Sequence, residues 1–318
     1  IQKGDEATDT PMTLAAPANC ILYCGGTPVF ADIRPDTYNI DPESIRAHIT
    51  EKTKAVVVVD FTGQAVELDE IRQICDEHKL VLIEDAAHAI GTKYKGRKIG
   101  SIADLTTFSF HPVKTVTAGE GGAVTTNDEE TYHRLLRLRT HGITRRREEM
   151  LHPTDALWYN EQVELGYNYR MTDFQAALLI SQLSKLDRFI RRRKEIVKRY
   201  DEAFSQCPEL IVQKEIPDSD TARHLYVIQL NPERLTCTRR EFFDALYAEN
   251  VCPQVHYLPV YRHSYYEKLG YTAGLCPEAE RLYENIMSIP LYYGLSDEDV
   301  ESVIAAVKKV IEWYRKKE

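Results

Sequence analysis

The chain has 318 residues, of which 43% are hydrophobic, and its formal net charge is -9. A chain of this length has enough apolar residues for one large core, or for a large domain and a smaller one. Its acidic excess gives no general attraction to nucleic acid or to anionic lipid, so neither is an expected partner.

The seven cysteines are scattered and odd in number, with no CxxC pair and no histidine cluster at zinc spacing. Neither a disulfide framework nor a metal site is therefore expected. The chain shows no signal-peptide pattern and no apolar stretch of the roughly 18 residues that a membrane helix needs. We predict a reduced, cytoplasmic protein. The chain opens at Ile1, and Gly4–Glu6 resembles the middle of a domain, so we expect an amino-terminal part to be missing.

The first half alternates apolar strands with amphipathic helices, the pattern of an α/β domain with a mostly parallel sheet. Residues 56–59 are a run of valines, which suits a strand buried on both faces. The helix that follows carries an apolar stripe of Leu68, Ile71, Ile74 and Cys75. Residues 80–83 predict another buried strand. Further strands are predicted at residues 106–110 and 123–126, separated by a glycine-containing loop.

A helical pattern runs from Thr172 to about Phe204, and its basic run at residues 191–194 is interpreted as a solvated face. The sequence after this helix predicts a domain boundary. We assign residues 1–206 to a large domain that includes the long interdomain helix, and residues 207–318 to a small α+β C-terminal domain.

Three elements are predicted in this second domain. Residues 225–230 form a strand, and Thr238 with Glu241 makes a capping box for a helix through Glu249. Apolar positions between Val300 and Tyr314 predict a last amphipathic helix.

The residues around Lys114 favour a nucleophilic lysine. It follows an apolar aromatic strand and the turn-forming His111 and Pro112, and it precedes the glycine loop at residues 119–122. Such a setting can desolvate the amine and lower its pKa, as a nucleophilic lysine requires near neutral pH. An ordinary exposed lysine is the alternative interpretation.

Three further side chains are candidates for the same site. Asp85 ends a predicted strand, where ligands of parallel sheets bind, and its carboxylate could keep a pyridine nitrogen protonated. The alternative is a helix N-cap. His88 lies three residues later, one helical turn away, so both side chains could face one pocket. Ser109 alternates with two phenylalanines on its strand and either binds phosphate or is a small strand residue.

Four ordered segments of this chain resemble the DegT/DnrJ/EryC1/StrS family of sugar aminotransferases. They are EDAAH (84–88), FSFHPVK (108–114), GEGGAVTTND (119–128) and GYNYRMTD (166–173). The similarity extends from Gly4 nearly to the end of the chain. It implies the fold of the fold-type-I, aspartate aminotransferase-like transferases, pyridoxal 5'-phosphate as cofactor, and a homodimer with shared active sites.

Within the family, residues 223–230 and 254–266 are most similar to the branch that acts in pseudaminic acid biosynthesis. That branch aminates the C4 ketone of a UDP-linked 4-keto-6-deoxy-N-acetyl-hexosamine, with glutamate as amino donor. The resemblance implies this transamination. The alternatives are another sugar aminotransferase of the family or a catalytically silent, truncated homologue.

The resemblance also assigns roles within one subunit. Lys114 would hold the cofactor covalently and shuttle the proton between cofactor and sugar carbon. Asp85 would pair with the ring nitrogen, and His88 would lie by the phenolic oxygen. Ser109 would contact the phosphate.

Other implied roles involve the partner subunit and the substrate. Asn168 would reach the phosphate of the neighbouring subunit's cofactor, and His256 and Tyr257 would line the sugar-nucleotide site. Family members usually carry an upstream segment whose helix N-terminus binds the phosphate, and this is the part that we expect to be missing. Leu14 stands where relatives often carry an aromatic residue that stacks on the ring.

Overall fold

A six-stranded sheet forms the centre of the computed structural model, which describes residues 1–317. Its strand order is β2-β1-β3-β4-β7-β8, and neighbours run parallel except for the antiparallel pair β7 and β8. The strands are β1 (Glu6–Asp9), β2 (Thr27–Phe30), β3 (Thr53–Val59), β4 (Val81–Asp85), β7 (Leu105–Ser109) and β8 (Gly122–Thr125). This mostly parallel sheet with its connecting helices confirms the predicted fold class.

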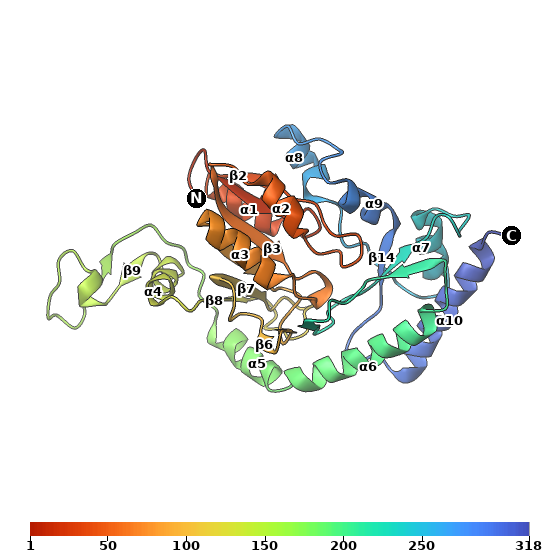
Figure 1. Ribbon diagram of the computed structural model, residues 1–318. Helices are drawn as coiled ribbons and strands as arrows, with labels where there is room; N and C mark the ends of the chain where they lie inside the picture. The colour runs from red at the N-terminus through yellow and green to blue at the C-terminus, as the bar shows by residue number, and fades with distance from the viewer. Residues whose placement is uncertain (318) are drawn as a thin grey trace.

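The central strand β3 is buried on both faces, because its valines lie between two layers of the molecule. Val56 and Val58 share one core with the predicted apolar stripe of helix α3. Three helices lie close to the sheet in Figure 1: α1 (Ala16–Tyr23), α2 (Pro42–His48) and α3 (Leu68–His78). The valine run and the helical stripe are thus confirmed as core.

The first residue of β4 departs from the prediction of a buried strand at residues 80–83. Val81 is 42% exposed. It lines a groove of about 900 Å³ that also involves residues of helix α4 (Glu129–Leu138). Ile83 is only partly buried and lines the same groove, whereas Leu82 is fully buried as predicted.

An arm of residues 139–171 follows α4 and extends away from the body of the molecule, at left in Figure 1. It contains the short antiparallel strands β9 (Ile143–Thr144) and β10 (Glu161–Gln162) and the 3₁₀ turn η2 (Arg147–Glu149). Large apolar side chains of the arm are exposed, including Leu157 at 95% and Trp158 at 82%. An exposed apolar surface of this kind is typical of a protein interface.

The predicted long interdomain helix is two helices, α5 (Asp173–Leu183) and α6 (Leu186–Phe204). Ser184 ends α5, and its hydroxyl donates a hydrogen bond to the carbonyl oxygen of Ser181 at 2.8 Å. The apolar spacing of residues 172–204 does not reveal this break between the two helices. In Figure 1 the two helices run beneath the sheet toward the C-terminal region.

The basic run of α6 is a solvated face only in part, and the interpretation is wrong for Arg193. Arg193 is only 4% exposed. Its Nη1 donates to the carbonyl oxygens of His224 and Leu291, both at 3.0 Å, and of Arg223 at 3.3 Å. Its neighbour Arg191 is exposed, as predicted.

The C-terminal region packs helices on an antiparallel sheet in the order β11-β13-β14. Its elements are β11 (Leu210–Val212), β13 (Tyr226–Leu230), β14 (Ile286–Ile289), α7 (Arg239–Ala248), η3 (Val260–Arg262), α8 (Ser264–Lys268), α9 (Pro277–Asn285) and α10 (Asp297–Tyr314). The capping box of Thr238 and Glu241 is confirmed, as is the last amphipathic helix. The boundary between residues 206 and 207 stays a prediction.

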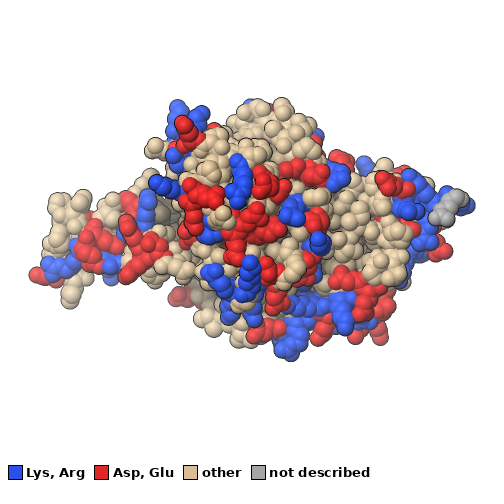
Figure 2. Space-filling view, in the orientation of Figure 1, with Lys and Arg blue, Asp and Glu red and all other residues tan. Residues whose placement is uncertain are grey.

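A small sheet connects the two halves of the chain. Strands β5 (Lys93–Tyr94) and β6 (Arg97–Lys98) pair with each other, and β12 (Ser219–Asp220) pairs with β5. Figure 2 shows acidic and basic side chains interspersed over the face in view. Each helix within residues 1–317 is too short or too polar to cross a membrane.

Candidate active site

The candidate site lies where parallel strands of the large sheet end. The register aligns Val59 of β3 with Asp85 of β4, and Asp85 with Thr107 of β7. Ligands of open α/β sheets bind at these carboxyl ends of strands. Asp85 therefore occupies the edge of the sheet that the sequence analysis predicted.

Lys114 lies in the loop between β7 and β8. This loop is closed by backbone hydrogen bonds from Phe110 N to Gly121 O at 2.8 Å and from Lys114 N to His111 O at 3.0 Å. Gly121 has a φ of +155°, a backbone conformation that L side chains rarely adopt, so this loop favours glycine there. Partial burial lowers the pKa of Lys114, while the nearby Asp85 carboxylate opposes this. Lys114 and Asp85 therefore lie close enough for each charge to act on the pKa of the other group.

The Asp85 side chain ends its strand in a turn. Its Oδ1 accepts a hydrogen bond from Ala87 N at 2.9 Å, and residues 86–92 form turns and irregular backbone. The alternative of a helix N-cap is therefore wrong, and so is the argument that His88 lies one helical turn away. A carboxylate that bonds to the backbone two residues later favours a turn. Burial raises the pKa of Asp85, and the Ala87 N–H and Lys114 act in the opposite direction.

His88 nevertheless reaches the pocket of Lys114, where aromatic side chains surround it. Its Nε2 lies 3.2 Å from Tyr257 Oη, and its ring centroid lies 4.5 Å from that of His224. Burial, together with His224 and Lys114, lowers the pKa of His88 well below its usual value. Its Nδ1 is buried without a hydrogen-bond partner among residues 1–317. His88 is therefore a neutral imidazole at neutral pH.

His224 lies beside His88 and was not predicted as a site residue. In the sequence it belongs only to a segment that precedes a predicted strand. Its backbone N–H donates to Thr62 O at 2.8 Å. A Cβ on Gly63 would lie 2.8 Å from His88 O and 3.1 Å from His224 N. Glycine is thus required where the turn after β3 (η1, Phe61–Gly63) approaches both histidines.

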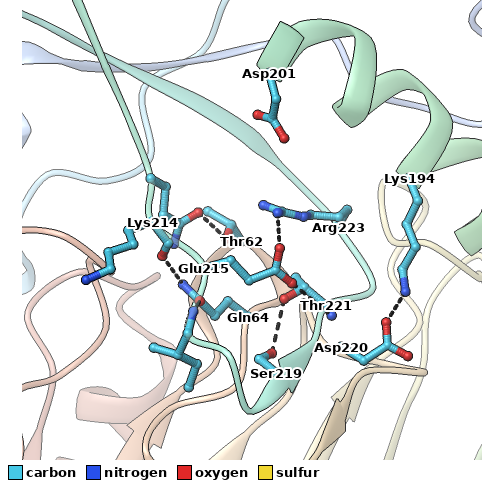
Figure 3. Close-up of polar contacts among 12 residues, drawn as sticks. Thr62, Gln64, Lys194, Asp201, Lys214, Glu215, Ser219, Asp220, Thr221 and Arg223 are labelled. Carbon is cyan, nitrogen blue, oxygen red and sulfur yellow. Dashed lines mark hydrogen bonds and ion pairs between the residues drawn. The ribbon is translucent and has the colours of Figure 1, made fainter. Parts of the chain in front are cut away.

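The loop before His224 is fixed to the turn that follows β3 by the polar contacts of Figure 3. Thr62 Oγ1 donates to Gln213 Oε1 at 2.7 Å, and Gln64 Nε2 donates to Lys214 O at 3.1 Å. Arg223 pairs with Glu215 in the same loop. These contacts fix the segment that positions His224 next to His88.

Three other predicted site residues are Ser109, His256 and Asn168. Ser109 is the last residue of β7, and its Oγ accepts a weak hydrogen bond from His111 N at 3.4 Å. His256 Nδ1 lies 2.8 Å from Ser288 Oγ, and burial beside Lys114 lowers the pKa of His256 to about 4. Asn168 is separate from them, exposed on the arm in an isolated bridge with Thr140.

The donor set fits the cofactor that the resemblance implies. The amine of Lys114, whose pKa is lowered, suits the carbonyl group of the cofactor. The nearby carboxylate of Asp85 suits its protonated pyridine nitrogen. The unpartnered Nδ1 of His88 leaves that imidazole with hydrogen-bonding capacity, and the Ser109 hydroxyl makes one weak contact. A cationic ring nitrogen would also offset the burial that raises the pKa of Asp85.

Comparison with known proteins agrees with this geometry. The DegT/DnrJ/EryC1/StrS aminotransferase family matches residues 1–308. The spore coat polysaccharide biosynthesis protein SpsC of Bacillus subtilis is 43% identical over 313 residues, covering 98% of this chain and 80% of that protein. The UDP-4-amino-4,6-dideoxy-N-acetyl-beta-L-altrosamine transaminase of Campylobacter jejuni is 39% identical over 310 residues, covering 96% and 79%.

Solved structures show the same fold. PseC of Helicobacter pylori, an aminotransferase involved in the biosynthesis of pseudoaminic acid, has a TM-score of 0.91 at 33% identity, covering 98% of this chain and 81% of that one. The PLP form of Spr1654 from Streptococcus pneumoniae has a TM-score of 0.89 at 32% identity, covering 98% and 82%. Pyridoxal phosphate, the expected cofactor, is thus found in solved structures of such aminotransferases. The chain belongs to the DegT/DnrJ/EryC1/StrS aminotransferase family.

Proposed function

We propose that this chain transfers an amino group from glutamate to the C4 ketone of a nucleotide-linked 4-keto-6-deoxy sugar, with pyridoxal phosphate as cofactor. The sugar is a UDP-linked N-acetyl-hexosamine. The observation that carries the proposal is the proximity of Lys114 to Asp85 at the strand ends, where each group acts on the pKa of the other. The named activities of similar proteins support the choice of substrate.

Each residue of the pocket has a role in this proposal. Lys114 holds the cofactor and moves the proton between it and the sugar carbon, which its lowered pKa favours near neutral pH. Asp85 keeps the ring nitrogen protonated, His88 lies by the phenolic oxygen, and Ser109 binds the phosphate. When bound, the cofactor supplies the electron sink that stabilises the carbanion at the substrate carbon.

The substrate side of the pocket is assigned to His256 and Tyr257. Both side chains are partly buried, and Ser288 of β14 orients the His256 ring. Burial keeps Tyr257 protonated by raising its pKa above the usual value. A neutral imidazole and a phenol are suitable partners for sugar hydroxyl and carbonyl groups.

The active enzyme is proposed to be a homodimer. The exposed apolar side chains of the arm, with Leu157 and Trp158 prominent, support a second copy as their partner. Asn168 lies on the same arm, so association there would bring it toward the partner's pocket. This supports the role of Asn168 at the cofactor phosphate of the neighbouring subunit.

The proposal is tested by incubating the protein with pyridoxal phosphate, glutamate and a panel of 4-keto-6-deoxy sugar nucleotides that differ in nucleotide and in N-acetylation. We expect 4-amino sugar product, greatest with the UDP-linked N-acetyl-hexosamine and lost in Lys114→Ala. Greater product formation from a sugar linked to a different nucleotide would contradict the assignment of UDP. Failure to form product from any keto sugar, despite cofactor binding, would favour the catalytically silent homologue.

A further inference from the structure

Two buried carboxyl groups adjoin Asp85, and neither has a role in the proposed reaction. Asp60 follows β3 and Glu84 precedes Asp85 on β4, and both are 0% exposed. Asp60 Oδ1 accepts from Val66 N at 3.0 Å, and Glu84 Oε2 accepts from Thr106 Oγ1 at 2.8 Å. The second oxygens, Asp60 Oδ2 and Glu84 Oε1, meet no hydrogen-bond donor among residues 1–317.

In the register of β3 and β4, Val58 is aligned with Glu84, and Asp60 lies two residues beyond Val58, so the two buried side chains lie on neighbouring strand ends. Each carboxyl group acts on the pKa of the other as a hydrogen-bonding neighbour. Two ionised carboxylates cannot hydrogen-bond, because each offers only acceptors. A single proton makes one of them a donor, and this satisfies both of the unpartnered oxygens. Burial and the negative charge of Asp85 also favour the protonated form, since they raise the pKa of Asp60 and of Glu84.

We propose that Asp60 and Glu84 share one proton at neutral pH and act as a positioning pair for Asp85. This inference rests on the proposed function, in which Asp85 is the anionic partner of the cofactor ring. The pair joins the ends of β3, β4 and β7, and the backbone N–H of Asp60 donates to Asp85 O at 3.1 Å. Asp60 Oδ1 also closes the turn that leads to Val66.

The shared proton has an electrostatic consequence for Asp85. Two ionised neighbours would add two negative charges beside Asp85, raise its pKa and weaken it as an anion. With one proton the pair carries a single negative charge. The negative charge of Asp85 raises the pKa of both members of the pair. The positive charge of Lys114 acts in the lowering direction on the pKa of Asp85.

Infrared spectroscopy of the full chain without cofactor tests the shared proton directly. At neutral pH we expect the carbonyl stretch of a protonated carboxyl group, lost in both Asp60→Asn and Glu84→Gln. Asp36→Asn is the matched control, because hydrogen bonds and charges from Lys214 and Arg34 lower the pKa of that carboxyl group and keep it ionised. Asp9 is also buried with a raised pKa and keeps its own band in both variants, so the band is read from wild-type-minus-variant difference spectra. Difference spectra without a carbonyl band for both variants would overturn the proposal.

Cofactor binding tests the positioning role. Asp60→Asn keeps a donor and the single negative charge of the pair, so we expect its affinity for pyridoxal phosphate to stay within about twofold of wild type. Asp60→Ala leaves Glu84 unpaired, and we expect about tenfold weaker binding, comparable to the loss of one hydrogen bond to a charged group. Equal affinity in a folded Asp60→Ala protein would overturn the positioning role. Absence of cofactor binding in the wild type would refute the proposed function and leave the infrared result standing.

Discussion

Replacing Arg193 by methionine tests whether this buried guanidinium holds the two halves of the chain together. The substitution keeps an unbranched side chain but removes the donor to the carbonyl oxygens of His224 and Leu291. A buried carbonyl group left unsatisfied costs about 1 to 3 kcal/mol, so two cost about 2 to 6 kcal/mol. Part of this is offset because a buried cation is removed, whose pKa burial lowers to about 10.

We therefore expect Arg193→Met to lower the free energy of unfolding by about 2 to 3 kcal/mol, a large fraction of the 5 to 15 kcal/mol of a typical protein. Urea unfolding followed by circular dichroism measures this loss. Arg191→Met is the matched control, since that neighbouring arginine is exposed. Arg193→Lys should also be destabilised, because an ammonium group lacks the planar fork that reaches several carbonyl groups. A loss below about 0.5 kcal/mol in Arg193→Met, equal to a surface change, would refute the reasoning.

Three further predictions follow from the site and the arm. The pKa of His256 is lowered to about 4 in the folded protein, so its contribution to stability is present above pH 6.5 and is lost as the pH falls toward 4. Stability to urea should decline across this range, and His88 and His224, whose pKa values are also lowered, contribute to that decline. His256→Gln should remove up to about 3 kcal/mol of the decline, and the same pH dependence in wild type and variant would contradict the assignment. Asp85→Ala should cripple the half-reaction with glutamate in single-turnover assays, because the electron sink is lost, and near-normal turnover would refute its role. Trp158→Asp should shift sedimentation from dimer toward monomer, whereas an unchanged dimer would place the interface elsewhere.

Elements with strong local patterns could be predicted from the sequence. The valines at residues 56–59 form a buried strand because a β-branched run suits a position between two layers. Thr238 and Glu241 cap their helix through contacts within a few residues of each other. In both cases the information that determines the structure is local.

Features that depend on distant contacts could not be predicted. Arg193 is buried because carbonyl groups about 30 and about 100 positions away converge on it. The break between α5 and α6 lies within a stretch whose apolar spacing is typical of one continuous helix. The turn after Asp85 replaces the expected helix because the side chain bonds to its own backbone.

In the candidate site, too, residues in local motifs could be predicted and residues placed by distant contacts could not. Lys114, Asp85 and His88 were selected by their motifs, and the structure places Lys114 near enough to act on the pKa of both other residues, although their roles stay predictions. His224 comes from a loop that is attached to the turn after β3 by long-range polar contacts, so no local signal in the sequence indicated it. Asn168 lies on the exposed arm, and its predicted role involves a second subunit.

The measurement that tests the central claim most directly is chemical labelling at Lys114. The protein is incubated with pyridoxal phosphate, reduced with borohydride, digested and analysed by mass spectrometry. We predict that the cofactor is attached to the peptide that contains Lys114, and that Lys114→Ala abolishes specific labelling. Labelling spread over exposed lysines, or unchanged in Lys114→Ala, would contradict the claim that Lys114 holds the cofactor.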